Sequence, residues 1–208
     1  MEDGGTAKVA DSPSAGNPTA PPAGDPDPVT EDDWIRGSRD AQVILIEYSD
    51  LECPYCKQFH ETLIGVSGEY DESQFAWVYR QFPLEQLHPK AVTEAVAAEC
   101  AGKLGGQDAF WAYIDKIFEV TPTNNKLDLE LLPGFATEIG LDTTGFQACL
   151  DSEDTMPLVE EDLVGGQKAG VRGTPGSFLV NTQTGESQYL PGALPPAQLS
   201  QMIDDMLN

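Results

Sequence analysis

Hydrophobic and polar residues alternate along this chain with two periods, one typical of strands and one typical of helices. An uninterrupted run of β-prone apolar residues at 43–46 predicts a buried strand over residues 42–49. The alternating, aromatic-rich residues 75–82 predict a second strand. Between them, apolar residues spaced four apart follow Pro54, which suits the first turn of a helix. This order predicts a parallel βαβ unit.

The same spacing of four recurs through the middle of the chain and predicts a block of helices. The expected helices cover residues 89–104, 108–120, 131–139, 146–150 and 154–169. Two short strands at residues 177–181 and 187–190, joined by a polar turn, and an amphipathic helix at 197–207 follow. The order βαβ, helices, ββα predicts an α/β fold.

Residues 1–30 are rich in Ala, Gly, Pro, Ser and Asp, and we expect a disordered acidic tail or a tether there. Met1 leads directly into an acidic stretch, which argues against a signal peptide, and no apolar run approaches the roughly 20 residues of a membrane span. Four cysteines favour an oxidising compartment. We therefore expect an extracytoplasmic protein, periplasmic or at the cell surface, whose leader has been removed. A cytosolic location is the alternative.

The chain carries 35 acidic and 11 basic residues among 208, a formal net charge of −24. This charge argues against binding to nucleic acid and against docking on anionic lipid. A well-solvated surface accounts for the acidity, and adaptation to high salt is the alternative.

The most informative motif is Cys53-Pro54-Tyr55-Cys56, between the first predicted strand and its helix. At a helix N-terminus the unpaired backbone N–H groups and the helix dipole favour a thiolate, which attacks disulfides and leaves them readily. The pair therefore predicts a redox centre in which Cys53 has a pKa well below that of a free thiol. A zinc site is the alternative, but it needs two further ligands and the chain has no second CxxC. We expect neither a metal nor a cofactor.

Glu47 lies in the first predicted strand, six residues before Cys53. A buried carboxylate is unfavourable unless it has a partner or a task, and burial raises its pKa. Glu47 is therefore a candidate catalytic residue that passes a proton to or from Cys56. Alternatively, it lies at the strand end and reaches water.

From Glu31 onward the sequence resembles the thioredoxin superfamily, and specifically the DsbA-like thiol–disulfide oxidoreductases with a helical insertion. The matching segments are residues 47–50, 53–57, 82–83, the helix around Cys100, 140–142, 149–150 and 170–175. Their order along the chain is far more specific than a CxxC motif alone.

The resemblance implies a thioredoxin-like fold with a central mixed sheet and an inserted helical subdomain. Its parts would be residues 31–86, the insertion 87–170, and residues 171–208. It also implies a cis bond between Thr174 and Pro175, facing the cysteine pair. Backbone groups of Thr174 would then bind an extended substrate segment by strand-like pairing.

The substrate-binding residues implied in this way are Pro54, Tyr55, Thr174 and Pro175. Gly176 and Ser177 depart from the larger residues that such proteins commonly carry after the proline, which leaves the shape of the substrate groove open.

The resemblance implies an enzyme that donates a disulfide to reduced protein or peptide substrates, acting as a monomer with a quinone-linked membrane redox partner. A reductase or isomerase using the same pair is the alternative. A non-catalytic thioredoxin-like binding module is a further one, although both cysteines and Pro175 are present.

Cys100 and Cys149 both lie on predicted helices and share faces with apolar neighbours. They could be buried free thiols. The favoured interpretation is a structural disulfide, which related oxidoreductases also show in some branches. It would contribute about 4 kcal/mol by closing a loop of roughly 50 residues.

Three residues near the motif are expected to have structural roles. His60 is expected to be packed and hydrogen-bonded rather than a proton shuttle, His88 to cap a helix, and Lys57 to be solvated.

Overall fold

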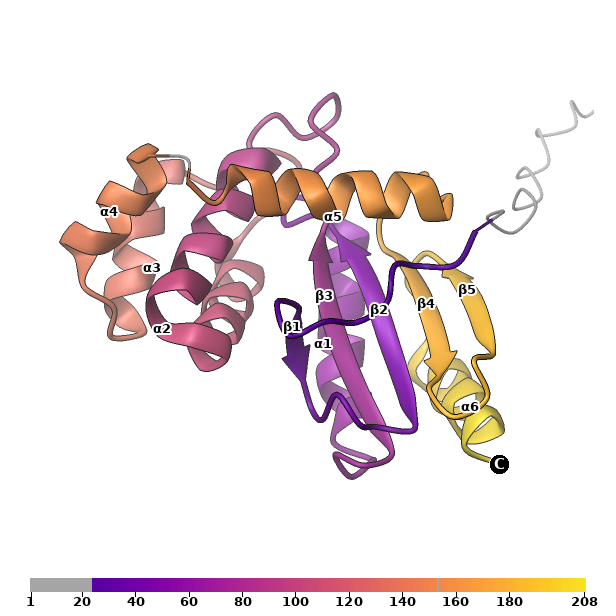
Figure 1. Ribbon diagram of the computed structural model, residues 1–208. Coiled ribbons are helices and arrows are strands. Elements are labelled where there is room, and N and C mark those ends of the chain that lie inside the picture. Colours follow the sequence, from indigo (N-terminus) through magenta and orange to yellow (C-terminus); the bar gives the residue numbers. More distant parts are fainter. Residues whose placement is uncertain (1–23, 153) are drawn as a thin grey trace, which may run out of the picture.

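The centre of the fold is a mixed five-stranded sheet, seen in a computed structural model that describes residues 24–152 and 154–208 (Figure 1). Its strand order is β1-β3-β2-β4-β5. β2 (Val43–Ser49) runs parallel to β3 (Phe75–Gln81), and the other neighbouring pairs are antiparallel. Every residue of these two strands is buried, which explains their apolar runs. The predicted α/β fold with a mixed sheet is confirmed.

The outer strands are short. β4 (Gly176–Asn181) and β5 (Ser187–Pro191) form the predicted hairpin, whose turn contains Gly185 at a φ of 75°. β1 (Trp34–Arg36) pairs with β3 at the opposite edge and was not predicted, because three residues are too few to show an alternating pattern.

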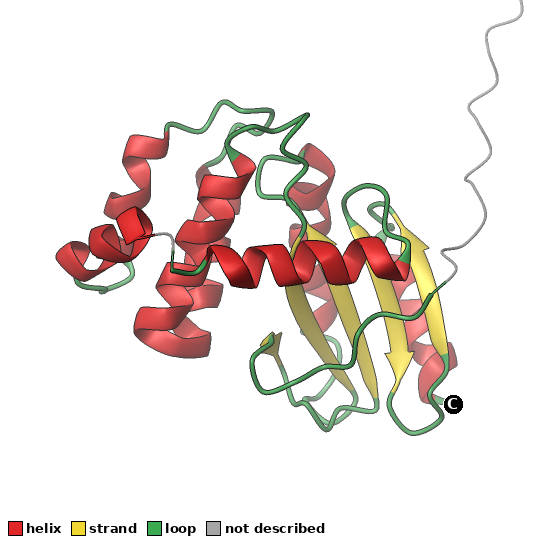
Figure 2. Cartoon of the chain, turned by 45° about the horizontal axis from the view of Figure 1, so that its top comes forward, coloured by secondary structure: helices red, strands yellow, loops and turns green. Residues whose placement is uncertain are grey.

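Helices cover both faces of the sheet (Figure 2). α1 (Pro54–Ser67) and α6 (Pro196–Leu207) pack on one face, and α5 (Met156–Ala169) crosses the other. Because successive strand residues point to opposite faces, Val43 and Leu45 belong to the first core, and their neighbours in β2 belong to the second. The sheet is therefore the middle layer of three.

The remaining helices form a block beside the β1 edge, between β3 and α5 in chain order (Figure 1). They are α2 (Ala91–Val120), the short η1 (Leu129–Leu131), α3 (Leu132–Glu138) and α4 (Thr143–Ser152). α2 is interrupted at Gly106, whose φ of 73° and ψ of −162° are not helical, so it consists of two helical stretches that meet at the break predicted between residues 104 and 108. The insertion does not stand apart from the sheet, because α5 returns across it.

One buried arginine fixes the segment before β1. Arg80 of β3 is only 5 % exposed; its guanidinium donates to the carbonyl oxygens of Asp27 and Pro28 at 2.9 and 3.1 Å, and it pairs with Asp33 at 2.8 Å. Residues 24–30, which were expected in the disordered tail, therefore belong to the folded part. The expectation for residues 1–23 lies outside the described residues.

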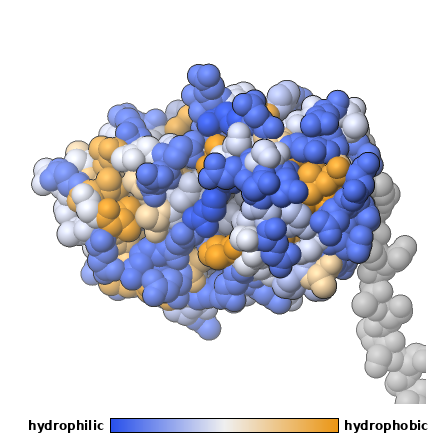
Figure 3. All heavy atoms as spheres, turned by 90° about the horizontal axis from the view of Figure 1, so that it is seen from below, coloured by the Kyte–Doolittle hydropathy of each residue, from blue (hydrophilic) through white to orange (hydrophobic). Residues whose placement is uncertain are grey.

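The face shown in Figure 3 is mostly hydrophilic, with apolar residues in small groups, in keeping with the charge of −24. Within residues 24–152 and 154–208, none of the helices combines the length and the apolar character required to cross a bilayer.

Gly102 of α2 provides a test of the packing between the helical block and β1. A Cβ atom at Gly102 would lie 2.3 Å from the Trp34 ring. That ring cannot easily move, because it stacks on Phe110 and its Nε1 donates to Glu99 at 2.7 Å. We expect Gly102→Ala to lower the free energy of unfolding by about 1–3 kcal/mol, measured by urea denaturation.

The matched control is Gly134→Ala in α3, where a Cβ atom would meet nothing within 4 Å. This variant should be neutral or more stable by up to about 1 kcal/mol, since alanine is the better helix former. Equal stabilities of the two variants would contradict the packing argument.

Candidate active site

The two cysteines of the CxxC motif lie where the central strand passes into α1. Cys53 is the N-cap residue, with extended backbone angles, and Pro54 occupies the first turn. Cys56 is fully buried in that turn, and Cys53 is 5 % exposed. Both are free thiols. The end of β2 and the start of α1 therefore hold a nucleophile and a second thiol one helical turn apart.

Hydrogen bonds lower the pKa of Cys53 to about 6. The largest contribution comes from the Cys56 thiol, and the backbone N–H groups of Cys56 and Tyr55 contribute further. Burial opposes these bonds but does not cancel them. Cys53 is therefore mainly a thiolate at neutral pH, as expected at a helix N-terminus.

Cys56 has the opposite character. Burial raises its pKa well above that of a free thiol, and the neighbouring Cys53 and Glu47 raise it further. The backbone N–H of Asp50 donates to its sulfur at 3.4 Å. The pair is thus divided into an outer thiolate and an inner protonated thiol, which is the arrangement that directs attack to the outer sulfur.

A loop from the far end of the chain faces this pair. The Thr174–Pro175 peptide bond is cis, and the Thr174 carbonyl oxygen lies 3.4 Å from the Cys53 sulfur, which donates to it when protonated. Tyr55 extends outward beside Cys53 and is 64 % exposed. Chain segments 121 residues apart therefore meet at one sulfur atom.

Gly176, which follows the cis proline, has no room for a side chain. A Cβ atom there would lie 2.8 Å from Val171 and 3.0 Å from the carbonyl oxygen of Gly173. The glycine that departs from the family pattern therefore reflects a close approach of two backbone segments.

Glu47 is fully buried behind the cysteines. Its Oε1 accepts the Ser49 hydroxyl at 2.7 Å, and its Oε2 accepts the Trp77 indole N–H at 3.0 Å. Burial outweighs these bonds and raises the pKa of Glu47 to about 8. The alternative in which Glu47 reaches water does not hold, and its protonation changes in the range where thiol chemistry takes place.

Several acidic residues near the motif were not singled out from the sequence. Asp50 accepts the backbone N–H of Leu84 at 2.8 Å, and its Oδ2 lies 2.9 Å from Nδ1 of His88. His88 therefore joins two loops and does not only cap a helix. Glu94 of α2 is fully buried, and burial together with the nearby Glu52 raises its pKa to about 10. The signal in the sequence is the unusual density of acids just before Cys53.

Lys57 and Glu52 hold the loop after α2 against the motif. The Lys57 ammonium donates to the Thr121 carbonyl oxygen at 2.8 Å. The Glu52 carboxylate accepts the backbone N–H of Asn125, and residues 123–125 all have left-handed φ values of 53–64°. Contrary to the expectation from the sequence, Lys57 thus binds the loop after α2 and is not simply solvated.

His60 is packed within the helical layer, four residues after Cys56. Its Nε2 lies 2.8 Å from Asp115, which also pairs with Arg36 at 2.8 Å. Burial lowers the pKa of His60. Its ring contacts Trp77 and not the sulfur atoms, in keeping with a structural role.

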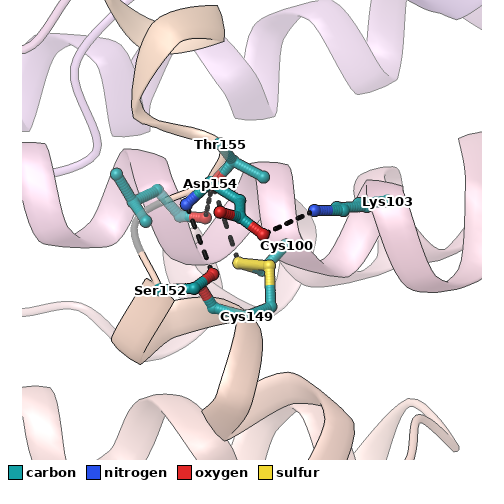
Figure 4. The surroundings of a disulfide bond; sticks show 7 residues. Cys100, Lys103, Cys149, Ser152, Asp154 and Thr155 are labelled. Atoms are coloured by element: carbon teal, nitrogen blue, oxygen red, sulfur yellow. Dashed lines mark hydrogen bonds and ion pairs between the residues drawn. A yellow bond between two sulfur atoms is a disulfide. The ribbon is translucent and has the colours of Figure 1, made fainter.

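Cys100 and Cys149 form a disulfide that links α2 to α4 (Figure 4). Their sulfur atoms are 2.05 Å apart, and the residues are 49 positions apart in sequence. The ion pair between Lys103 and Asp154 lies beside them. The bridge joins helices of the inserted block, and the CxxC cysteines take no part in it.

In the part of the chain that the structure describes, no three His, Cys, Asp or Glu side chains are grouped so that they could hold a metal ion. The zinc alternative therefore has no ligand set among these residues.

The low pKa of Cys53 predicts how the stability of the reduced protein depends on pH. The folded protein releases this proton near pH 6 and the unfolded chain near about 8.5, so the unfolded state binds more protons in between. The Cys53 contribution to stability should therefore rise from about pH 6 to 8.5, and it is lost as the pH falls through 6.

This prediction is checked by the difference in melting temperature between the reduced protein and its Cys53→Ser variant. The raised pKa of Glu47 acts in the opposite direction, but burial, its largest cause, is the same in both proteins, so most of this contribution cancels in the difference. A difference that does not change with pH would contradict the assignment of the thiolate to Cys53.

Comparison with known proteins agrees with this geometry. The family described as "Thioredoxin" matches residues 29–205. Among solved structures, Pseudomonas aeruginosa DsbA2 is 27% identical with a TM-score of 0.71, covering 86% of this chain and 96% of that one. Bacillus subtilis BdbD in its oxidised form is 20% identical with a TM-score of 0.78, covering 90% and 99%.

The relatives found by sequence are named as ion antiporters, unlike the solved structures above. A protein named Na(+)/H(+) antiporter NhaA 1 from Salinispora arenicola is 34% identical over 178 residues, and one named Na(+)/H(+) antiporter NhaA from Herminiimonas arsenicoxydans is 35% identical over 172. Each match covers 83% of this chain but 25% of the relative. The chain thus spans about a quarter of the length of the curated relatives it matches.

Proposed function

Because the chain belongs to the thioredoxin family, as a DsbA-like member of that superfamily, we propose that it donates disulfides to reduced protein substrates outside the cytoplasm. The observation that carries this proposal is the division between the two thiols of the CxxC motif. Cys53 has a pKa of about 6, and that of Cys56 is raised well above the ordinary value. A stable Cys53 thiolate makes the closed Cys53–Cys56 disulfide a good oxidant, since the better leaving group favours the reduced protein.

The reaction follows from this division. A substrate thiolate attacks the Cys53 sulfur of the closed disulfide, and the Cys56 sulfur leaves with the electron pair and takes up a proton. A second substrate thiolate then attacks the substrate sulfur of the mixed disulfide. Cys53 leaves as the stable thiolate, the substrate gains a disulfide, and the enzyme is reduced by two electrons.

The groups around Cys53 support a role in binding extended peptides. Thr174 offers backbone groups beside the Cys53 sulfur; Pro54 and Tyr55 follow Cys53 in the chain, and Pro175 follows Thr174 through the cis bond. The exposed Tyr55 ring offers an apolar contact to a substrate side chain. We propose that substrate segments pair with Thr174 as an added strand.

The equilibrium redox potential against glutathione, measured beside the oxidation of a reduced two-cysteine peptide, tests the direction of the reaction. An oxidase should have a potential above about −200 mV and oxidise the peptide stoichiometrically. A potential near about −270 mV, with rapid reduction of peptide disulfides, would favour the reductase or isomerase alternative. If the pair stays closed in excess reduced glutathione and oxidises no peptide, the oxidase proposal is wrong.

The cellular setting belongs to the same proposal. An oxidase needs reoxidation after each turnover, and we propose a quinone-linked membrane protein as the electron acceptor. The disulfide between Cys100 and Cys149 supports an extracytoplasmic location, since such bonds persist in oxidising compartments. We propose that the protein acts there as a monomer.

The relatives by sequence favour a second candidate role, as a redox module that acts on a Na⁺/H⁺ antiporter. This chain matches a quarter of each of two polypeptides with that name. Membrane vesicles containing an NhaA-type antiporter from the same organism test this role. The oxidised protein should change the sodium-dependent antiport rate, and the Cys53→Ser variant should not. An antiport rate that neither protein alters would contradict it.

A further inference from the structure

Ser49, the last residue of β2, binds one of the two groups that must exchange a proton and directly precedes the residue that binds the other. It is fully buried, and its hydroxyl donates to Oε1 of Glu47 at 2.7 Å. The next residue, Asp50, donates its backbone N–H to the Cys56 sulfur at 3.4 Å, which places this end of β2 against the inner thiol. Burial raises the pKa of Cys56, and the nearby Ser49 side chain opposes that effect.

The surroundings leave the inner thiol few other routes for its proton. Cys56 and Glu47 are each fully buried, so water does not reach them directly from the surface. Both donors to Glu47 found in the described part of the chain, Ser49 and Trp77, are uncharged. A carboxyl group without a cationic partner can accept and return a proton near neutral pH.

The groups that face Glu47 come from three other elements. α1 contributes the titratable thiols of Cys53 and Cys56, and β3 contributes the Tyr79 hydroxyl, whose pKa burial raises well above its ordinary value. β4 places Ser177 opposite Glu47 in the sheet register. Ser177 does not titrate, and neither does Cys53 while its sulfur is held in a mixed disulfide. Glu47 is then the group in this set whose charge changes near pH 8.

We propose that the Ser49 hydroxyl relays the proton between Cys56 and Glu47 during thiol–disulfide exchange. This inference rests on the proposed function, and it adds a residue to which neither the CxxC motif nor the cis-proline loop points.

The step is clearest when the reduced protein reacts with oxidised glutathione. The Cys53 thiolate attacks one glutathione sulfur, the glutathione disulfide breaks, and one glutathione thiolate leaves. The Cys56 proton then passes to the Ser49 oxygen while the Ser49 hydroxyl proton passes to the Glu47 carboxylate. The Cys56 thiolate attacks the Cys53 sulfur, closes the disulfide and expels the second glutathione as a thiolate. Two protein thiols are oxidised, and one glutathione disulfide becomes two glutathiones.

Removal of the Ser49 hydroxyl should slow closure of the Cys53–Cys56 disulfide and should not slow formation of the mixed disulfide. In Ser49→Ala, formation of the mixed disulfide by Cys53 should stay within about twofold of the unaltered protein, and ring closure should slow by about tenfold or more at pH 7. Acid quenching and mass spectrometry separate the two steps, because the mixed disulfide accumulates when ring closure is slow. Ser49→Thr, which keeps the hydroxyl, should restore most of the rate.

The pH profile distinguishes a relay from a merely structural effect. Ring closure in the unaltered protein should accelerate up to about pH 8, as Glu47 becomes a carboxylate, and then level off. Both Ser49→Ala and Glu47→Gln should lose this inflexion. A profile that keeps its inflexion in Ser49→Ala would overturn the inference.

A double-mutant cycle gives a second, independent readout. If Ser49 acts through Glu47, then Ser49→Ala should have almost no further effect on ring closure in a Glu47→Gln background. Equal slowing in both backgrounds would overturn the relay. Failure of the proposed function looks different, since the unaltered protein would then form no mixed disulfide with oxidised glutathione.

Discussion

Replacing Cys53 by serine is expected to reduce thiol–disulfide exchange to its uncatalysed background, a loss of at least about a thousandfold. Cys53 is the thiol whose pKa is lowered to about 6, and serine cannot supply a comparable nucleophile at neutral pH. The measurement is the rate at which the oxidised protein converts a reduced two-cysteine peptide to its disulfide. The variant should keep its fold, because the side chain is changed by a single atom.

Two matched controls make this result specific. Cys56→Ser cannot form the closed disulfide, but with oxidised glutathione it should still react through Cys53 and stop at a covalent mixed disulfide, because no second protein thiol can close the ring. The double variant Cys100→Ala/Cys149→Ala should keep its exchange rate, since that bridge lies within the inserted helices. Full exchange activity in Cys53→Ser would place the redox centre elsewhere, and so would a loss of activity confined to Cys100→Ala/Cys149→Ala.

Opening the Cys100–Cys149 bridge is expected to lower the free energy of unfolding by about 4 kcal/mol. The bridge connects residues 49 positions apart, and in the chain-entropy model a closed loop of that size restricts the unfolded chain by about this amount. The comparison is best made in a Cys53→Ser/Cys56→Ser background, where a reductant can open only this bond. Urea denaturation with and without reductant then measures the bridge without changing any packed side chain.

A change of less than about 1 kcal/mol would show that the bridge restricts little beyond what helix packing already fixes. The same experiment after adding Cys149→Ser to the Cys53→Ser/Cys56→Ser background provides a control, since the stability of that variant should not respond to reductant.

The central strands and the helix after the motif could be predicted because their patterns are long and regular. β2 and β3 are seven-residue runs with strong β preference, and Pro54 marks the start of α1. β1 could not be predicted in this way. It is three residues long, and it forms because Trp34 packs on the helical block and its neighbours pair with β3.

The segment before β1 shows the same limit. Its composition resembles that of a flexible tail, and nothing within it reveals that Arg80, some fifty residues later, binds its carbonyl groups. A contact between distant parts of the chain is set by the tertiary fold, so local composition predicts the wrong state for residues 24–30.

The candidate site was predicted in part, for a comparable reason. Cys53 and Cys56 are a local motif, and Glu47 is conspicuous as an acid in an apolar strand. Ser49 carries no such signal, because a serine at the end of a strand is ordinary until its partners are known. The contact between Asp50 and His88 likewise joins two loops that only the folded sheet brings together.

The Cys53 thiolate is stabilised by neutral hydrogen-bond donors, and no cation is among the causes of its lowered pKa. Dissolved ions screen long-range forces far more than such short contacts, so the acidity of this sulfur should hardly respond to ionic strength. The outer surface behaves differently, because a charge of −24 repels anionic disulfides at low ionic strength. Turnover of oxidised glutathione should therefore accelerate with added sodium chloride, while turnover of an uncharged disulfide stays constant. At high salt concentration the Cys53 thiolate should keep its reactivity, and only the rate at which anionic disulfides reach it should change.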